Sequence, residues 1–331
     1  MRIVALFLCL SALDTLKKVD VVCPIDGTRF TASEVVSTDA APPLFWGGVD
    51  TDTCRHAFRT LPMEHYVWTC PKCSFSGTKE DFDPKKAPSD DLKKKIREAL
   101  KPAAPIPAGA RQEQIPGWVK YDLLAQVEAA KGSPPLDIAW RHLNAAWAAR
   151  QAGPVRLDDY DDWIEASTSA GLEKVPLDLG KKNRSEEDLA ACRKLEKELG
   201  KYKGNALLVR QYLLANTYRR RGENVDALRW LDEVDKAKGE NSIIADAAKK
   251  VRESIAVERA QQKKAAAFYA KVVEDPAVVA SIKFKSLYQL GEIARRCGEN
   301  ADARSWYDKA IAATSDEAQK KLVEAQKGLL K

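Results

Sequence analysis

Beyond residue 117 the chain repeats apolar residues at intervals of three and four, which is the pattern of amphipathic helices. A glycine or proline interrupts this pattern roughly every 15 to 20 residues and marks the helix ends. Alternating β-branched runs are nearly absent from this part of the sequence, so it is predicted to be all-α. The predicted helices are 118–131, 136–152, 158–170, 186–199, 205–221, 224–237, 241–258, 262–274, 279–297, 300–313 and 315–330.

Part of this helical pattern repeats itself with an offset of 76 residues. Leu214, Ala215, Tyr218, Gly222, Ala227, Leu231 and Val234 match Leu290, Gly291, Ala294, Gly298, Ala303, Tyr307 and Ala310. Half the offset gives a weaker middle copy at Ala260, Ala265, Tyr269 and Val272. Small residues let two antiparallel helices approach, and the two glycines suit the turn between them. The pattern resembles the tetratricopeptide repeat, in about three units over residues 203–313, with a capping helix at 315–331.

The first helix of each unit is expected to line a groove for an extended or helical segment of another protein. The residues expected to face it are Arg210, Asn216, Arg220, Gln289 and Glu292. The run Arg219–Arg221 is predicted to be a solvated helix end, where the helix dipole favours positive charge.

Near the N-terminus, two short stretches look alike: Cys23-Pro24-Ile25-Asp26-Gly27 and Cys70-Pro71-Lys72-Cys73-Ser74. In each, Cys-Pro opens a tight turn, and the residue three positions on points back to the same centre. This is the geometry of zinc knuckles, two of which complete a tetrahedral site. The strand-like run 65–69 leads into the second stretch, as a ribbon hairpin requires. A small zinc-ribbon-like β module is therefore predicted over residues 17–83.

We expect Cys23, Cys70 and Cys73 to bind the metal. Cys54 is the favoured fourth ligand, because four of the seven cysteines fall within 51 residues. Asp26, His56 and His65 are alternatives for that position. A pair of disulfides or a redox-active Cys70–Cys73 pair would also be compatible with an oxidising compartment.

A zinc ion in this module is expected to be structural. A segment of about 70 residues with few aliphatic side chains buries little surface, and bound metal adds folding energy. Catalytic zinc sites usually use histidine ligands and keep a position open, but the chain has three histidines and no HExxH pattern.

Residues 84–117 are predicted to be a proline-rich linker. Residues 83–116 contain six prolines, and residues 89–100 are predicted to form one short helix with Ser89 as its N-cap. We therefore expect residues 117–331 to fold without the metal module.

The first residues are one positive charge followed by an apolar run, the order found in secretory signals. This predicts a signal peptide over residues 1–16 and export to the periplasm or cell envelope. A buried N-terminal strand or helix in a cytoplasmic protein is the alternative. No apolar run reaches the roughly 18 residues of a membrane span.

Charge argues against nucleic acid as the partner. The 54 basic and 48 acidic side chains leave a net charge of +6, and residues 1–88 hold 10 basic against 11 acidic side chains. Counterion release from a nucleic acid would be weak on such a surface.

Several motifs together resemble the bacterial domain-of-unknown-function family 2225. They are Cys23–Phe30, Gly48–Cys54, Cys70–Gly77 with Asp81-Phe82, Lys120–Ala125, Pro134–Trp140 and Leu143–Arg150. The resemblance implies a zinc-ribbon-like module followed by tetratricopeptide-like helices, with no established activity. The chain departs from the family in two places: Asp26 replaces the second cysteine of the first knuckle, and Ser74 replaces a glycine.

The sequence thus predicts a non-enzymatic scaffold or adaptor, stabilised by zinc, that binds another protein through its helical repeats. An exported thiol-disulfide oxidoreductase using Cys70 and Cys73, or a nucleic-acid-binding zinc ribbon, are the alternatives.

Overall fold

The fold is described from a computed structural model of the chain, for residues 16–35, 46–57, 63–152, 161–170, 184–237 and 241–330. The expected signal peptide falls almost wholly on residues 1–15, outside these ranges. Within them, no helix combines the length and the apolar character needed to cross a bilayer.

The N-terminal part is built from three antiparallel two-stranded sheets. They pair β1 (Leu16–Val22) with β2 (Arg29–Val35), β3 (Trp46–Val49) with β4 (Arg55–Ala57), and β5 (Trp68–Thr69) with β6 (Ser76–Gly77). The short helix α1 (Met63–Tyr66) precedes β5, and 3-10 turns η2 (Lys79–Phe82) and η3 (Pro84–Lys86) follow β6. The β1–β2 and β5–β6 hairpins share a small aromatic core, in which Phe82 packs against Phe30, Trp68 and Phe75. The predicted small β module is therefore present.

The segment predicted to be a linker is packed against this module. Helix α2 (Asp90–Ala99) begins at Ser89, whose side chain accepts a hydrogen bond from the Leu92 N–H, as the N-cap prediction required. Its Ile96 is fully buried in the cluster that contains Phe75 and Phe82. Gln112, in η4 (Gln112–Gln114), bonds both backbone groups of Thr69. The helix was predicted correctly, but its apolar face holds the segment on the β module.

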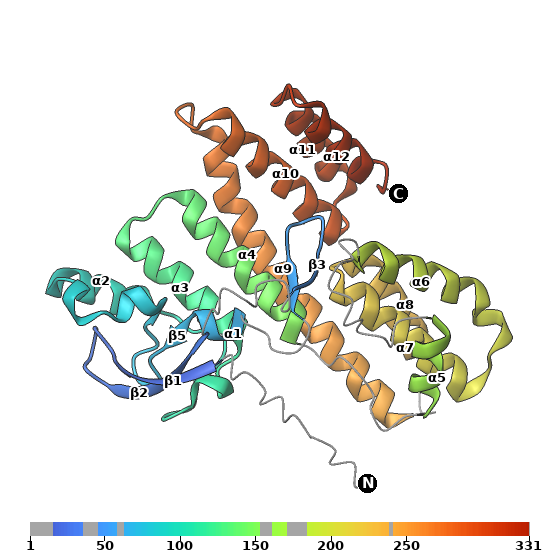
Figure 1. Ribbon diagram of the computed structural model, residues 1–331, viewed down its shortest axis with the longest axis horizontal. Helices are drawn as coiled ribbons and strands as arrows, with labels where there is room; N and C mark the ends of the chain where they lie inside the picture. Colours follow the sequence, from blue (N-terminus) through green and yellow to red (C-terminus); the bar gives the residue numbers. More distant parts are fainter. Residues whose placement is uncertain are drawn as a thin grey trace, which may run out of the picture.

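The rest of the chain is helical, as predicted. The helices are α3 (Gly117–Lys131), α4 (Pro135–Ala152), α5 (Asp161–Ala170), α6 (Arg184–Glu198), α7 (Gly204–Arg220), α8 (Asn224–Lys236), α9 (Ser242–Glu274), α10 (Ala280–Cys297), α11 (Asn300–Ala312) and α12 (Glu317–Lys327), with the 3-10 turn η5 (Leu199–Lys201) after α6. Helix α9 crosses the molecule and packs against α4, α7, α8 and α10 (Figure 1). The prediction of two helices over 241–274 was wrong: α9 is continuous over 33 residues. No glycine or proline interrupts it, and the polar Gln261 and Gln262 are buried in contacts with other helices.

The internal repeat is present as two helical hairpins, α7–α8 and α10–α11. The first helices begin at Gly204 and Ala280, and the second at Asn224 and Asn300, so both pairs keep the offset of 76 residues. Gly222 and Gly298 follow the first helices with left-handed φ angles of 71° and 81°. The expected middle copy does not form a hairpin, because its residues lie within α9.

In each hairpin, one residue of the first helix packs against one residue of the second, and the two hairpins use different residue pairs at this contact. In α10–α11, a Cβ at Gly291 would lie 2.4 Å from the Tyr307 ring, so the large ring requires a glycine opposite it. The equivalent positions in α7–α8 hold Ala215 and Leu231, both fully buried. A smaller second-helix residue there leaves room for a methyl group.

A turn from the N-terminal part enters the helical part. In Figure 1 the hairpin that contains β3 lies between α10 and α6, and its turn ends at the buried Cys54. The guanidinium of Arg150 on α4 donates to Asp50 Oδ2 at 3.0 Å and to Asp52 Oδ2 at 2.7 Å. It also donates to Glu258 on α9 at 2.7 Å. Each of these four side chains is at most 1% exposed.

Helix α10 holds the other side of this turn. Thr51 donates to Glu292 Oε2 at 2.6 Å and accepts from Arg296 at 2.9 Å. Tyr288 donates to the Thr51 carbonyl at 2.8 Å, and Gln289 to the Asp52 carbonyl at 3.2 Å. The turn therefore bonds a row of first-helix residues of the second hairpin.

Because of this arrangement, most of the residues expected to line a free groove are not available to a partner. Gln289 and Glu292 contact the chain's own turn, Arg210 and Asn216 are buried, and Arg220 is exposed. The prediction of a solvated helix end at residues 219–221 was wrong for two of its three arginines. Arg219 and Arg221 are buried, since Arg219 bonds the Ala149 carbonyl and Arg221 pairs with Asp188.

The turn gives a reason to expect that the helical part is not independent of the N-terminal part. Burial alone raises the pKa of Asp52, but Arg150 and Arg296 reverse this and hold it well below its usual range. Without the turn, Arg150 would keep only Glu258 and Arg296 would lose Asp52, and incompletely neutralised buried charge is costly.

We predict that Asp52→Asn lowers the free energy of unfolding by about 3–5 kcal/mol, because it removes a buried carboxylate shared by Arg150 and Arg296 and leaves the cluster with excess positive charge. Urea unfolding at pH 7 measures this. The matched control is Asp20→Asn on the exposed face of β1, which should change stability by at most about 0.5 kcal/mol. Equal stability of the two variants would contradict this role of the turn.

The same pair predicts a pH dependence. Because the folded pKa of Asp52 is lowered, its contribution is present above the unfolded value of about 4 and is lost as the pH falls below it. The stability difference between wild type and Asp52→Asn should therefore shrink below about pH 4. A difference that grows on acidification would contradict the assignment.

For the repeat, we predict that Gly291→Ala costs about 1–3 kcal/mol through overpacking against Tyr307. In the Tyr307→Leu background, which recreates the pair found in α7–α8, the same substitution should cost about 1 kcal/mol less. A double-mutant cycle by urea unfolding measures this coupling. An additive result would show that the two positions do not share one packing site.

Candidate metal centre

The two Cys-Pro stretches form loops with the same backbone hydrogen bonds. In the first, the Cys23 N–H donates to the Thr28 carbonyl at 2.9 Å, and the Gly27 N–H donates to the Cys23 carbonyl at 2.9 Å. Gly27 has a left-handed φ of 74°. The loop brings the residue before Gly27 back toward the Cys23 sulfur.

The second loop repeats these features. The Cys70 N–H donates to the Phe75 carbonyl at 2.8 Å, and the Ser74 N–H donates to the Cys70 carbonyl at 3.0 Å. Ser74 has a φ of 64°, a conformation that glycine adopts without strain. Asp26 and Cys73 therefore hold equivalent positions, each just before the left-handed residue.

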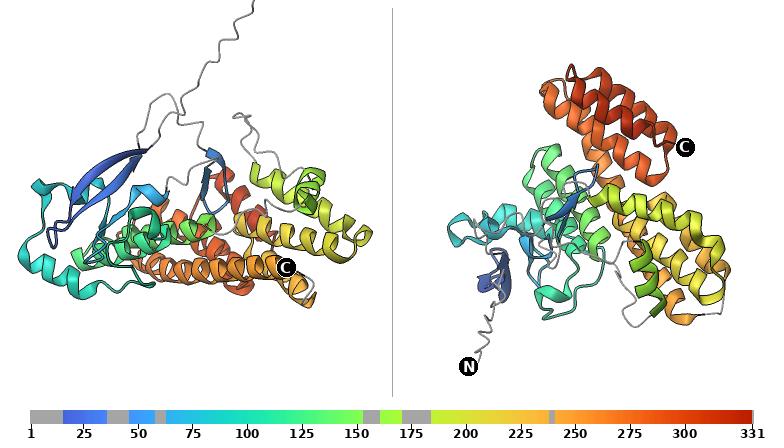
Figure 2. Two further views of the ribbon diagram at one scale, coloured as in Figure 1. Left: turned by 90° about the horizontal axis from the view of Figure 1, so that it is seen from below. Right: turned by 45° about the vertical axis from the view of Figure 1, so that its right-hand side comes forward.

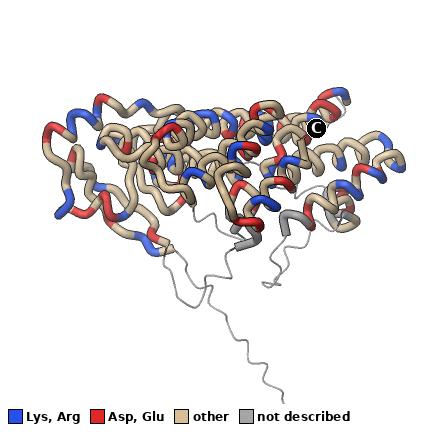
Figure 3. Tube along the Cα trace, turned by 90° about the horizontal axis from the view of Figure 1, so that it is seen from above, with Lys and Arg blue, Asp and Glu red and all other residues tan. Residues whose placement is uncertain are grey.

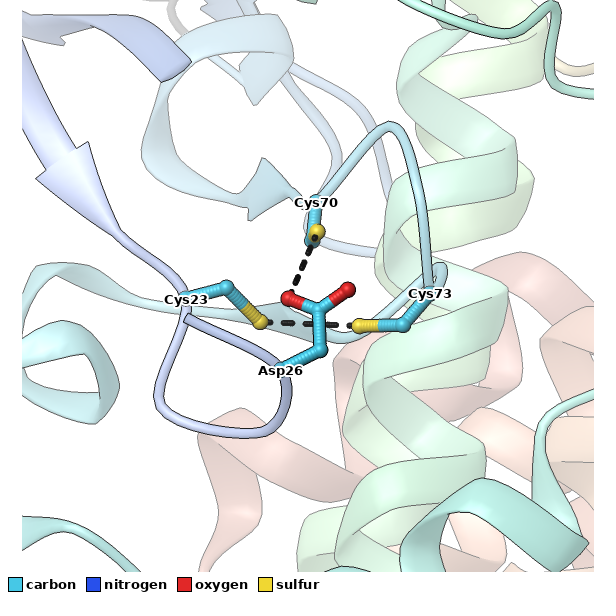
Figure 4. A group of neighbouring side chains, drawn as sticks. All are labelled: Cys23, Asp26, Cys70 and Cys73. Atoms are coloured by element: carbon cyan, nitrogen blue, oxygen red, sulfur yellow. Dashed lines mark hydrogen bonds between the residues drawn. The ribbon is translucent and has the colours of Figure 1, made fainter. Parts of the chain in front are cut away.

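Four side chains converge between the loops (Figure 4). The ligand atoms of Cys23, Asp26, Cys70 and Cys73 all lie within 4.8 Å of one another. The Cys23 and Cys73 sulfurs are 3.5 Å apart, and Cys70 Sγ lies 3.7 Å from Asp26 Oδ1. Each knuckle contributes two of the four groups.

These residues fit a tetrahedral zinc ion. A Zn–S bond of about 2.3 Å in a tetrahedron separates two sulfurs by about 3.8 Å, close to the 3.5 Å between the sulfurs of Cys23 and Cys73. Asp26 Oδ1 accepts from the Thr28 N–H at 3.0 Å, but Oδ2 is buried and has no hydrogen-bond partner among the described residues. A cation bound at the centre would give this buried oxygen a partner.

The thiols of the group influence one another. Hydrogen bonds from Cys23 and Cys73, followed by those from the backbone N–H groups of Cys73 and Lys72, lower the pKa of Cys70. The hydrogen bond with Cys70 is the main cause that raises the pKa of Cys23, and burial adds to it. Bound zinc would favour deprotonation of all three thiols.

Cys54, the favoured fourth ligand, does not belong to this group. It is fully buried among Tyr121, Leu143 and Trp147 and accepts a hydrogen bond from Gln151. Burial raises the pKa of its thiol well above the ordinary value. The structure instead brings in Asp26, the weaker alternative, because Asp26 is part of the first knuckle while Cys54 ends the turn that enters the helices. Cys54 thus lies outside the candidate metal group, and Asp26 takes the fourth position in it.

The surroundings of the centre suit a structural metal. Cys23 and Cys70 are buried, and Phe75 and Ile96 lie in the same apolar cluster. Arg97 on α2 donates to the Ile25 carbonyl in the first loop. The chain following Cys73 continues into strand β6, whereas a redox dithiol typically stands at the start of a helix.

Comparison with known families matches residues 16–255 to uncharacterized proteins conserved in bacteria (DUF2225). This match covers well over half of the chain. The chain belongs to the DUF2225 family. A tetratricopeptide repeat matches residues 286–321, which cover most of α10, α11 and the beginning of α12. No curated protein and no solved structure matches the chain.

The region matched by the DUF2225 family contains both the four candidate metal ligands and the turn at residues 50–54, and it ends within α9. The sequence did not reveal the buried ionic cluster. The arginines of the cluster, Arg150 and Arg296, lie near the C-terminal ends of their helices. Positive charge is common there because it interacts favourably with the helix dipole, so these residues did not stand out. The available signal was Asp50-Thr51-Asp52-Thr53-Cys54, a polar turn that ends in a cysteine.

We predict that the purified DUF2225 protein contains about one zinc per chain. Cys70→Ser should lose the metal, because three ligands remain, whereas Cys54→Ser should retain it. Metal analysis of both variants after gel filtration measures the difference. Loss of zinc in Cys54→Ser with retention in Cys70→Ser would contradict the ligand set.

Asp26 allows a second test. Asp26→Cys should preserve or strengthen zinc binding by restoring a four-cysteine site, and Asp26→Asn should weaken it by removing the negative charge. Competition with a chromogenic chelator compares the two variants, which differ at a single position. Equal affinities would show that Asp26 is not a ligand.

Proposed function

We propose that this DUF2225 protein is a non-enzymatic scaffold. In it, a structural zinc stabilises the N-terminal β module of residues 17–83, here called the head, and the helical repeats bind another protein. The observation that carries the proposal is the turn held by α10. Side chains of the second repeat hairpin already hold a turn of the chain itself: Tyr288, Gln289 and Arg296 all donate to residues 51–53. Tetratricopeptide repeats bind protein segments in this manner.

The bound turn supports a scaffolding role because it joins the two parts of the chain. The head contributes Asp50 and Asp52, and the helices contribute Arg150 and Arg296. A head fixed on the repeats presents its surface and theirs in one geometry. That rigidity lowers the entropic cost of binding a partner.

The two alternatives find less support. For a thiol oxidoreductase, Cys70 and Cys73 share their centre with Cys23 and Asp26, and that arrangement favours a metal over dithiol exchange. For a nucleic-acid-binding ribbon, a continuous basic surface would be needed. Lys and Arg alternate with Asp and Glu along the chain in Figure 3.

We further propose that the protein acts outside the cytoplasm. The support is the charged and apolar order of the first residues, which is that of a secretory signal. Cellular fractionation of the tagged chain tests this separately from the scaffolding role.

The function is tested by purifying the tagged full chain from its own cells. We expect a protein partner in near-stoichiometric amount and no thiol-disulfide exchange with a generic disulfide substrate. Asp52→Asn, which loosens the head from the repeats, should retain less partner than the control Asp20→Asn. Exchange activity that is lost on Cys73→Ser, without a partner, would overturn the proposal in favour of an enzyme.

A further inference from the structure

A groove of about 980 Å³ lies beside the metal centre, at the β1–β2 hairpin. One wall is formed by Thr28 and residues 29–31 of β2, and the other by residues 108–111 with Ile106. Pro71 and Lys72, at the tip of the second knuckle, also line it. The hairpin stands at the edge of the molecule, away from the repeats (Figure 2).

The groove runs along the free edge of β2. Four consecutive residues line it, whereas one face of a strand would contribute only alternate residues. Among the described residues, β2 pairs only with β1. The Ser33 carbonyl points outward, since it accepts from Trp68 Nε1 at 3.0 Å.

Backbone groups two and four residues before Ser33 have the same outward direction in an antiparallel ladder. These are the groups of Thr31 and Arg29, and neither makes a backbone hydrogen bond to a described residue beyond β1. The edge therefore offers free N–H and C=O groups in the spacing of a strand. Such an edge is a template for a further strand.

The groove is positively charged. Lys18 forms an ion pair with Glu113 across it. Arg29, Lys72 and Arg111 are exposed, and none of them has a carboxylate within 4.0 Å among the residues that the structure describes. Three exposed cations that form no close ion pair with a described carboxylate thus surround an open strand edge, and Glu113 is the one acidic residue lining the described groove.

We infer that this groove binds an extended acidic segment of a partner protein, which adds a strand to β2. Backbone hydrogen bonds would supply affinity, and carboxylates at alternate positions would meet Arg29, Lys72 and Arg111. A phosphodiester chain fits less well, because it offers only acceptors to the strand edge. Single strands also require exposed aromatic rings for base stacking, and Phe30, the aromatic of the groove, packs edge-on against Phe82.

This inference goes beyond the proposed function, since it gives the head a binding surface of its own. The test uses the zinc-loaded full chain and a fluorescein-labelled heptapeptide of alternating glutamate and valine, titrated by fluorescence anisotropy. A labelled oligothymidine is titrated in parallel.

Two matched pairs of variants separate the strand edge from the charge. Thr31→Pro removes one outward N–H and blocks pairing, whereas Thr31→Ala keeps the backbone intact. Arg111→Glu reverses a charge in the groove, whereas Lys95→Glu reverses an exposed one on α2. Circular dichroism and zinc content establish that each variant is folded.

We expect Thr31→Pro and Arg111→Glu each to weaken peptide binding about tenfold, the effect of losing about one good hydrogen bond or charge contact. Thr31→Ala should weaken binding much less than Thr31→Pro, and Lys95→Glu should bind like wild type. Absence of peptide binding, binding of oligothymidine in its place, or equal affinity of Thr31→Pro and Thr31→Ala would each overturn the inference. None of these outcomes depends on whether the repeats bind a partner.

Discussion

The structure depends on the neutralisation of Arg150 by carboxylates that come from a distant part of the chain. Its guanidinium is fully buried in α4, and Asp50 and Asp52 reach it from about 100 residues earlier in the sequence. A buried arginine without such partners would cost several kcal/mol. The turn can provide them only if it enters the helical part. This requirement sets where the head lies on the repeats.

Several local features follow from the position of the turn. Thr53 has a φ of 69°, a costly conformation for a β-branched residue, and its hydroxyl accepts a hydrogen bond from Gln289. Glu292 receives hydrogen bonds from both Thr51 and Tyr307. The second repeat hairpin thus uses one buried carboxylate to hold the turn and the neighbouring helix together. The candidate metal site lies in another part of the N-terminal module, next to its small apolar cluster.

Much of this fold could be predicted from the sequence, because it rests on short-range rules. Glycines and prolines marked the helix ends, and the offset of 76 residues found two real helical hairpins. The two knuckles were recognisable because each needs only a Cys-Pro turn and a ligand three residues on. The same reasoning failed at α9, where periodicity identified the buried positions but could not show that one helix spans both segments.

The remaining errors concern residues whose roles depend on distant partners. Counting cysteines favoured Cys54 over Asp26, but the backbone of the first knuckle decides which side chain reaches the centre. Arg219 and Arg221 were predicted to be exposed to solvent. No neighbouring residue in the sequence indicates that the Ala149 carbonyl lies beside Arg219 and that Asp188 lies beside Arg221. The packing of residues 84–117 against the N-terminal module also depends on distant residues, since Gln112 bonds Thr69, 43 residues earlier in the chain.

The central claim is that the turn at residues 50–54 unfolds only together with the helices that bind it. Native-state hydrogen exchange over a series of denaturant concentrations tests this most directly, because it measures the free energy of opening at single amides. The amides of Asp50 and Thr53, which are bonded within the turn, should open with the same free energy as core amides of α4 and α10. Exchange of the turn amides through a low-energy opening, while α4 and α10 stay protected, would contradict the account.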